Sequence, residues 1–97
     1  MTRKETLDAA AKCVCGGRDI DYGVPENHFA AVGTFWSEYL RGKGIGIDMN
    51  EITPTDVTMM LALLKIARVA SGKPHVDNFV DLAGYAACGA EIATSEQ

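Results

Sequence analysis

Two cations in an otherwise apolar segment near the middle of the chain are the residues best suited to chemistry. Lys65 and Arg68 are three residues apart, so on a helix they share one face. A buried cation without a partner is costly, so we expect acidic side chains close by. Asp77 and Asp81 lie four residues apart in the next segment, and Tyr85 follows at the same spacing. If the two segments form an antiparallel helical hairpin, the cations and carboxylates meet near its closed end.

This charged cluster has two interpretations. In the structural one, the cation stems pack on the core and ion pairs hold the two helices together. In the functional one, the cations bind phosphate oxygens while the two carboxylates hold a magnesium ion through oxygen ligands. Asn78, which lies between the two acids, is then a further candidate ligand-binding residue, and Tyr85 contacts a base or sugar. The spacing of the acids is common in proteins, so both interpretations stay open.

A second group of polar side chains lies in the connector over residues 19–29. Tyr22 could stack on a nucleobase, and Glu26 could supply another carboxylate to the magnesium ion. The alternative is that Gly23 and Pro25 shape a turn on which Tyr22 packs, while the acids favour the start of the next helix.

The elements that position these residues are predicted to be helices, from apolar side chains at three- and four-residue spacing and from glycine and proline at the ends. The expected helices cover about residues 4–15, 25–42, 54–70 and 76–94. A glycine-rich loop over 42–52 joins the second to the third. Alternating apolar residues in that loop are also compatible with a short β-ribbon, which is an alternative prediction for this segment. They are Ile45, Ile47 and Met49.

The third helix has the clearest start, because Thr53 can cap it, Pro54 suits its first position, and Asp56 completes a capping box. It is apolar nearly all round, and such a helix is normally enclosed by its neighbours. The prediction is therefore an all-α, four-helix bundle-like single domain over residues 1–97, built around this helix.

The length, net charge and hydrophobic content of the chain limit the classes of partner that it can bind. A chain of 97 residues, 47% of them hydrophobic, can form a core, but a small domain buries a small share of its surface, so a homo-oligomer is expected. The net charge of −4 argues against non-specific binding to nucleic acid. No apolar run is long enough to cross a membrane and no secretion signal is visible, so the expected location is the cytoplasm.

Three segments together resemble a family of small uncharacterised domains encoded mainly by phages and prophages. They are Asp21-Tyr22-Gly23-x-Pro25-Glu26-Asn27-x-Phe29, Lys65-Ile66-Ala67-Arg68 and Asp77-Asn78-Phe79-Val80-Asp81-Leu82-Ala83-Gly84-Tyr85-Ala86. The last two also look like the nucleotide-modification-associated domains of phages. More distantly they look like the all-α NTP pyrophosphohydrolases, the MazG and dimeric dUTPase group.

That distant resemblance implies magnesium held by carboxylates on two helices and cleavage of a nucleoside triphosphate to a monophosphate and pyrophosphate. It places Asp77 and Asp81 at the second acidic motif of the group. The Glu-Glu-x-x-Glu motif of the preceding helix has no match here, and Glu26 is the acid best placed to stand in for it. Fewer carboxylates weaken magnesium binding and the activation of water.

Three functions follow as hypotheses. The first is a phage-type nucleotide-binding protein that sequesters a nucleotide or nucleotide signal. The second is a magnesium-dependent, MazG-like pyrophosphohydrolase, and the third is a protein-interaction module in which the charged cluster only holds helices together. Whether the chain is an enzyme stays open at this point.

Overall fold

The computed structural model describes residues 1–15, 25–46 and 50–95, except the side chains of Pro25 and Glu26. Its helices are α1 (Arg3–Val14), α3 (Pro25–Gly42), α4 (Pro54–Ser71) and α5 (Val76–Ser95). Within these ranges there is no strand, so the predicted all-α, four-helix fold is confirmed. Residues 43–46 and 50–53 contain no β-ribbon, and Ile47 and Met49 lie outside the described residues.

Side-chain caps fix two of the helix starts. The backbone N–H of Asp56 donates to Thr53 Oγ1 at 3.1 Å, and the backbone N–H of Thr53 donates to Asp56 Oδ2 at 3.0 Å. This is the capping box predicted for α4, with Pro54 in the first turn. Thr2 and Glu5 form the same reciprocal pair at the start of α1. In the described part of the chain, no helix is both long and apolar enough to cross a bilayer.

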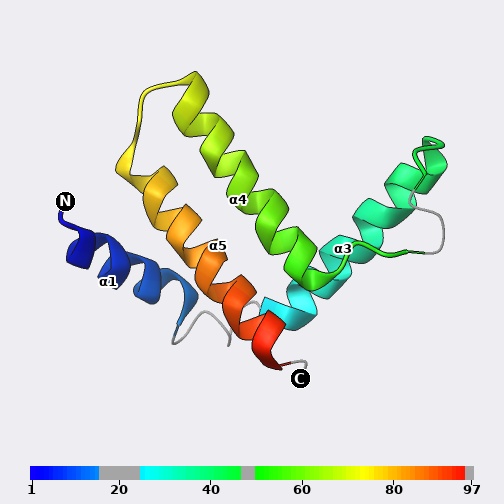
Figure 1. Cartoon of the computed structure of the whole chain (residues 1–97), viewed down its shortest axis with the longest axis horizontal. Helices are drawn as coiled ribbons and strands as arrows, with labels where there is room; N and C mark the ends of the chain where they lie inside the picture. The colour runs from blue at the N-terminus through cyan, green and yellow to red at the C-terminus, as the bar shows by residue number, and fades with distance from the viewer. Residues whose placement is uncertain (16–24, 47–49, 96–97) are drawn as a thin grey trace.

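The helices pack in a row rather than around a common axis. The main contacts join α1 to α5, α5 to α4, and α4 to α3. Figure 1 shows α4 and α5 as an antiparallel hairpin, with α1 against α5 and α3 leaning away from α4 to form a V. The molecule is accordingly open, with extents of 44 × 33 × 25 Å and a radius of gyration of 14.7 Å.

Glycines allow the close helix contacts in this row. A Cβ added at Gly89 of α5 would lie 2.7 Å from Thr58 Oγ1 of α4, and one at Gly84 would lie 3.1 Å from Val14 Cγ1 of α1. Gly89 lacks room for a side chain and Gly84 has little, so the backbone of α5 approaches its two neighbours closely. The core cluster lies where α3, α4 and α5 meet, and its buried members are Phe29, Val57, Cys88 and Ile92.

The expectation that the apolar third helix, α4, is enclosed by neighbours is wrong for a single chain. Its buried residues all lie on one side of the helix. They are Val57, Thr58 and Ala62. The cause is the row arrangement, because α1 packs mainly on α5 instead of closing over α4. Large hydrophobic side chains on the rest of α4 are between 41% and 61% exposed: Met59, Met60, Leu63, Leu64 and Ile66.

Candidate functional site

The predicted meeting of charges across the α4–α5 hairpin occurs at one pair. Lys65 Nζ of α4 lies 2.9 Å from Asp81 Oδ2 of α5. The lysine side chain is only 11% exposed, whereas the aspartate side chain is 38% exposed. The ammonium group is therefore held between the helices, while part of the carboxylate remains accessible to solvent.

The other two charges of the cluster, Arg68 and Asp77, are both exposed. Within the described residues neither forms an ion pair. Arg68 lies in the last turn of α4 and Asp77 in the first turn of α5. Each charge is favoured there by the helix dipole, which is negative at a helix C-terminus and positive at an N-terminus. Both residues are thus available to a ligand.

The uncharged candidates on α5 lie deeper. Asn78 is buried, and its backbone N–H donates to the carbonyl oxygen of His75 at 3.1 Å. Tyr85 is partly buried and packs against the core cluster. Both residues therefore contribute to packing in this structure, and contact of Tyr85 with a base or sugar stays a prediction.

The remaining candidates are not positioned by the structure. Tyr22 and the side chain of Glu26 lie outside the described residues. Among the residues that are described, no three His, Cys, Asp or Glu side chains gather closely enough to hold a metal ion. The described part of the predicted magnesium site thus consists of Asp77 and Asp81, one helical turn apart.

The Lys65–Asp81 pair retains capacity for a ligand. A lysine ammonium carries three N–H donors, and the contact with Asp81 needs one of them. A phosphate oxygen reaching this ammonium would be drawn by its charge and opposed by the neighbouring carboxylate. Arg68, three residues along α4, can add a two-pronged contact to the same anion.

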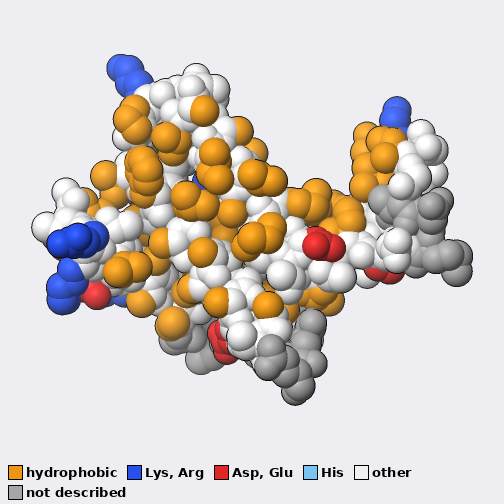
Figure 2. All heavy atoms as spheres, in the orientation of Figure 1, with side chains coloured by type: hydrophobic (Ala, Val, Ile, Leu, Met, Phe, Trp, Pro, Cys, Tyr) orange, Lys and Arg blue, Asp and Glu red, His pale blue; other side chains and the backbone are white. Residues whose placement is uncertain are grey.

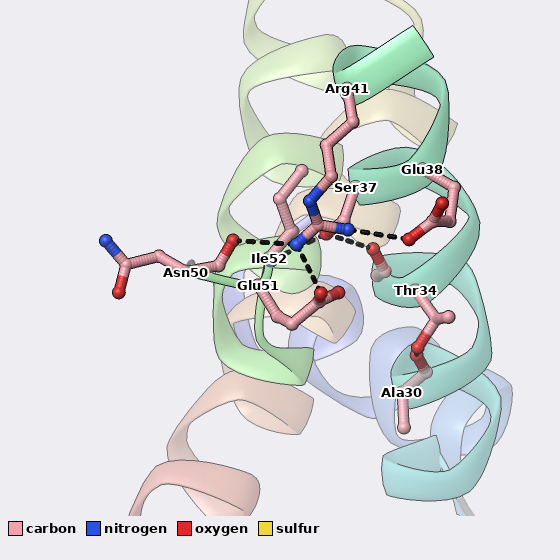
Figure 3. Close-up of polar contacts among 9 residues, drawn as sticks. Ala30, Thr34, Ser37, Glu38, Arg41, Asn50, Glu51 and Ile52 are labelled. Carbon is pink, nitrogen blue, oxygen red and sulfur yellow. Dashed lines mark hydrogen bonds and ion pairs between the residues drawn. The ribbon is translucent and has the colours of Figure 1, made fainter. Parts of the chain in front are cut away.

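A second polar network, which sequence reasoning did not identify, joins the segment before α4 to α3 (Figure 3). Arg41 donates to Glu38 Oε1 at 2.7 Å, to the carbonyl oxygen of Asn50 at 3.3 Å and to the carboxylate of Glu51. The hydrogen bond with Glu51 raises the pKa of Arg41, and the same bond lowers the pKa of Glu51. These contacts hold residues 50–51 on the last turns of α3.

Ser37 makes the buried half of this connection. Its side chain is fully buried, accepts a hydrogen bond from the backbone N–H of Ile52 at 2.8 Å, and donates to the carbonyl oxygen of Gly33 at 2.7 Å. A Cβ at Gly33 would overlap the carbonyl oxygen of Ile52. The signal in the sequence is a glycine and a serine four residues apart on the apolar face of a helix, where side chains normally pack.

Comparison with known proteins gives a family. Residues 5–93 match the model of a family described as a domain of unknown function, DUF6378. The chain belongs to this family. It is 40% identical over 80 residues to the Gene 55 protein of Mycobacterium phage L5, an alignment covering 82% of this chain and 47% of that protein. It is 37% identical over 82 residues to the Gene 55 protein of Mycobacterium phage D29, covering 84% of this chain and 49% of that one.

The family assignment confirms the predicted link with phage-encoded domains of unknown function, because both relatives are phage proteins. The chain spans about half the length of these relatives. No solved structure matches it.

Proposed function

We propose that this domain binds a nucleotide, or another small phosphorylated molecule, at the charged pair between α4 and α5, and sequesters it. The observation that carries the proposal is the Lys65–Asp81 pair at 2.9 Å, in which the cation is held with its side chain only 11% exposed. A cation fixed in this way loses little side-chain freedom when it binds an anion, which favours affinity.

Arg68 supplies the second phosphate contact in this proposal. It is exposed in the last turn of α4, and it lies on the same side of this helix as Lys65. The resemblance of these α4 and α5 segments to phage nucleotide-modification-associated domains, and more distantly to the MazG group, favours a nucleotide over other phosphorylated molecules.

Magnesium fits the proposal as a companion of the nucleotide. Asp77 and Asp81 lie one turn apart on α5, and protein-bound Mg²⁺ is often held by one or two carboxylates together with substrate phosphates. Asp81 would then share its oxygens between Lys65 and the ion. Cleavage of the nucleotide, as in a pyrophosphohydrolase, is the alternative that the experiment must separate from simple binding.

The test is a depletion-and-release assay. The purified protein is incubated with ribo-, deoxyribo- and cyclic nucleotides plus Mg²⁺, and the filtrate and the heat-denatured protein are chromatographed separately. We expect one nucleotide to disappear from the filtrate and to be released intact. New products would instead establish an enzyme, and a panel unchanged in both fractions would refute nucleotide binding.

Two variants locate the site. Arg68→Ala removes an exposed cation beside the pair, and Lys43→Ala removes one just after the C-terminal end of α3 as a matched control. We expect Arg68→Ala to weaken binding about tenfold, as for one charge-assisted contact of about 1.5 kcal/mol. Lys43→Ala should bind normally. Equal losses in the two variants would show that charge in general, and not this site, draws the ligand.

A second candidate function is a helical protein-interaction module. It is favoured by the exposed hydrophobic side chains of α3 and α4, since contiguous apolar patches on a protein surface commonly mark interaction sites. In this case the Lys65–Asp81 pair only joins two helices, and the nucleotide panel is returned unchanged.

A further inference from the structure

The single chain exposes more surface than a compact protein of its size. Its accessible surface is 6837 Å², whereas a folded monomer of 10.4 kDa exposes about 5,400 Å². The radius of gyration agrees, at 14.7 Å against about 12.5 Å for a compact chain of this length. The excess of about 1,400 Å² is larger than the roughly 800 Å² that each partner contributes to a standard protein interface.

In the described part of the chain, seven of the twelve exposed large hydrophobic side chains lie on the two helices that form the V. Figure 2 shows hydrophobic side chains along α4 and again over the arm formed by α3. On α3, Phe35 and Tyr39 are 72% and 67% exposed, although they lie one turn apart on a helix with a well-buried opposite side. On α4, the exposed hydrophobic side chains lie between Met59 and Ile66, about two helical turns, with Leu63, 61% exposed, near their centre. We call these exposed residues of α3 and α4 the open apolar face.

Charge is excluded from the α4 part of this face. Between Asp56 and Arg68 the only charged residue is Lys65, and its side chain points into the contact with α5. The whole outer side of three helical turns is therefore free of charge. Interfaces between permanent partners are more apolar than ordinary surface and depleted of charge at their centre. A face of this kind is typical of a permanent contact.

We infer that a second copy of this chain covers the open apolar face, with the α3 and α4 arms of the two copies packed together about a two-fold axis. The area favours this occupant, because the surface excess is sufficient for one interface of dimer size. A two-fold contact uses the same patch on both copies, so one face suffices.

The first test is the mass of the purified chain in solution. Sedimentation equilibrium at micromolar concentration should give twice 10.4 kDa, or an even multiple of it. The midpoint of thermal unfolding should rise with protein concentration, as expected when folding and association are coupled. A single-chain mass, with a midpoint independent of concentration, would overturn the inference and leave a different protein as the occupant.

Matched variants place the interface. Leu63→Glu sets a charge at the centre of the face, whereas Leu7→Glu makes the same change on α1 at nearly the same exposure, 63% against 61%. We expect Leu63→Glu to raise the dissociation constant by at least about 100-fold, because two charges are desolvated in each dimer. Leu7→Glu should remain dimeric. A Leu63→Glu protein that stays dimeric would overturn the proposed location.

A milder variant guards against misfolding. Phe35→Ser alters a side chain that is 72% exposed within its own chain, so the fold of one copy loses little packing. We expect weaker association with unchanged helix content by circular dichroism. Unchanged association of Phe35→Ser would exclude the α3 arm from the interface and overturn this arrangement.

Discussion

Replacing Gly33 by alanine tests the connection between α3 and the segment that leads into α4. In an exposed helix interior this change is stabilising by about 1 kcal/mol, because glycine is a poor helix former. Here the new methyl group would overlap the carbonyl oxygen of Ile52, and it would lie 3.2 Å from the carbonyl carbon of that residue. Ile52 must therefore move away from α3.

The size of the effect follows from what that movement breaks. The Ser37–Ile52 hydrogen bond contributes about 0.5–1.5 kcal/mol, and overpacking costs about 1–3 kcal/mol. After the gain in helix propensity of about 1 kcal/mol, Gly33→Ala should be destabilising by about 0.5–3.5 kcal/mol. For a domain of this size that lowers the unfolding midpoint by roughly 2–17 °C.

The assay is thermal and urea unfolding followed by circular dichroism at one fixed protein concentration. Gly42→Ala is the matched control, because it makes the same substitution at the end of α3 where no atom lies within 4 Å of the new Cβ. We expect it to change stability by less than about 0.5 kcal/mol. A Gly33→Ala protein as stable as the Gly42→Ala protein would refute the close packing of Ile52 on α3.

Three further predictions concern other contacts. Asp81→Leu should be destabilising by about 1–3 kcal/mol because it strands Lys65, and adding Lys65→Met should restore most of the loss in urea unfolding; additive losses would contradict the pairing. Gly89→Ala should lower the unfolding midpoint, since its Cβ meets α4 at 2.7 Å; a raised midpoint would contradict that close approach. The hydrogen bond from Arg41 lowers the pKa of Glu51 in the folded state. The ionised Glu51 therefore stabilises the folded protein fully above the ordinary carboxyl pKa, and this stabilisation is lost as the pH falls through the lowered pKa. The difference in midpoint between wild type and Glu51→Gln should therefore shrink on acidification, and a difference independent of pH would exclude this role.

The helices were predictable because their signals are local. Thr53, Pro54 and Asp56 define the start of α4 within four residues, and the structure forms that capping box. The Lys65–Asp81 contact was predictable because a short connector forces the two helices to be antiparallel neighbours. The bond from Arg41 to Glu51 was not, because it depends on how the loop returns to α3 and no spacing in the sequence encodes that path.

The candidate site was predictable only in part. The sequence groups Lys65, Arg68, Asp77 and Asp81 by helical spacing, but spacing does not fix how far each side chain lies from the facing helix. In the structure Lys65 and Asp81 form a pair while Arg68 and Asp77 remain exposed. Tyr85 follows the two acids at the same spacing, yet it packs on the core. One face of a helix can be buried at one turn and exposed at the next.

The apolar character of α4 connects the fold to both proposals. Hydrophobicity in a sequence indicates that a helix is covered, but it does not indicate which chain supplies the cover. One chain covers the side that carries Lys65 and leaves the side that carries Leu63 exposed. If a second copy covers the latter, the apolar pattern is satisfied without enclosing the charged pair. The two proposals then depend on opposite sides of one helix, so Leu63→Glu tests association while Arg68→Ala tests ligand binding, and the failure of either leaves the other standing.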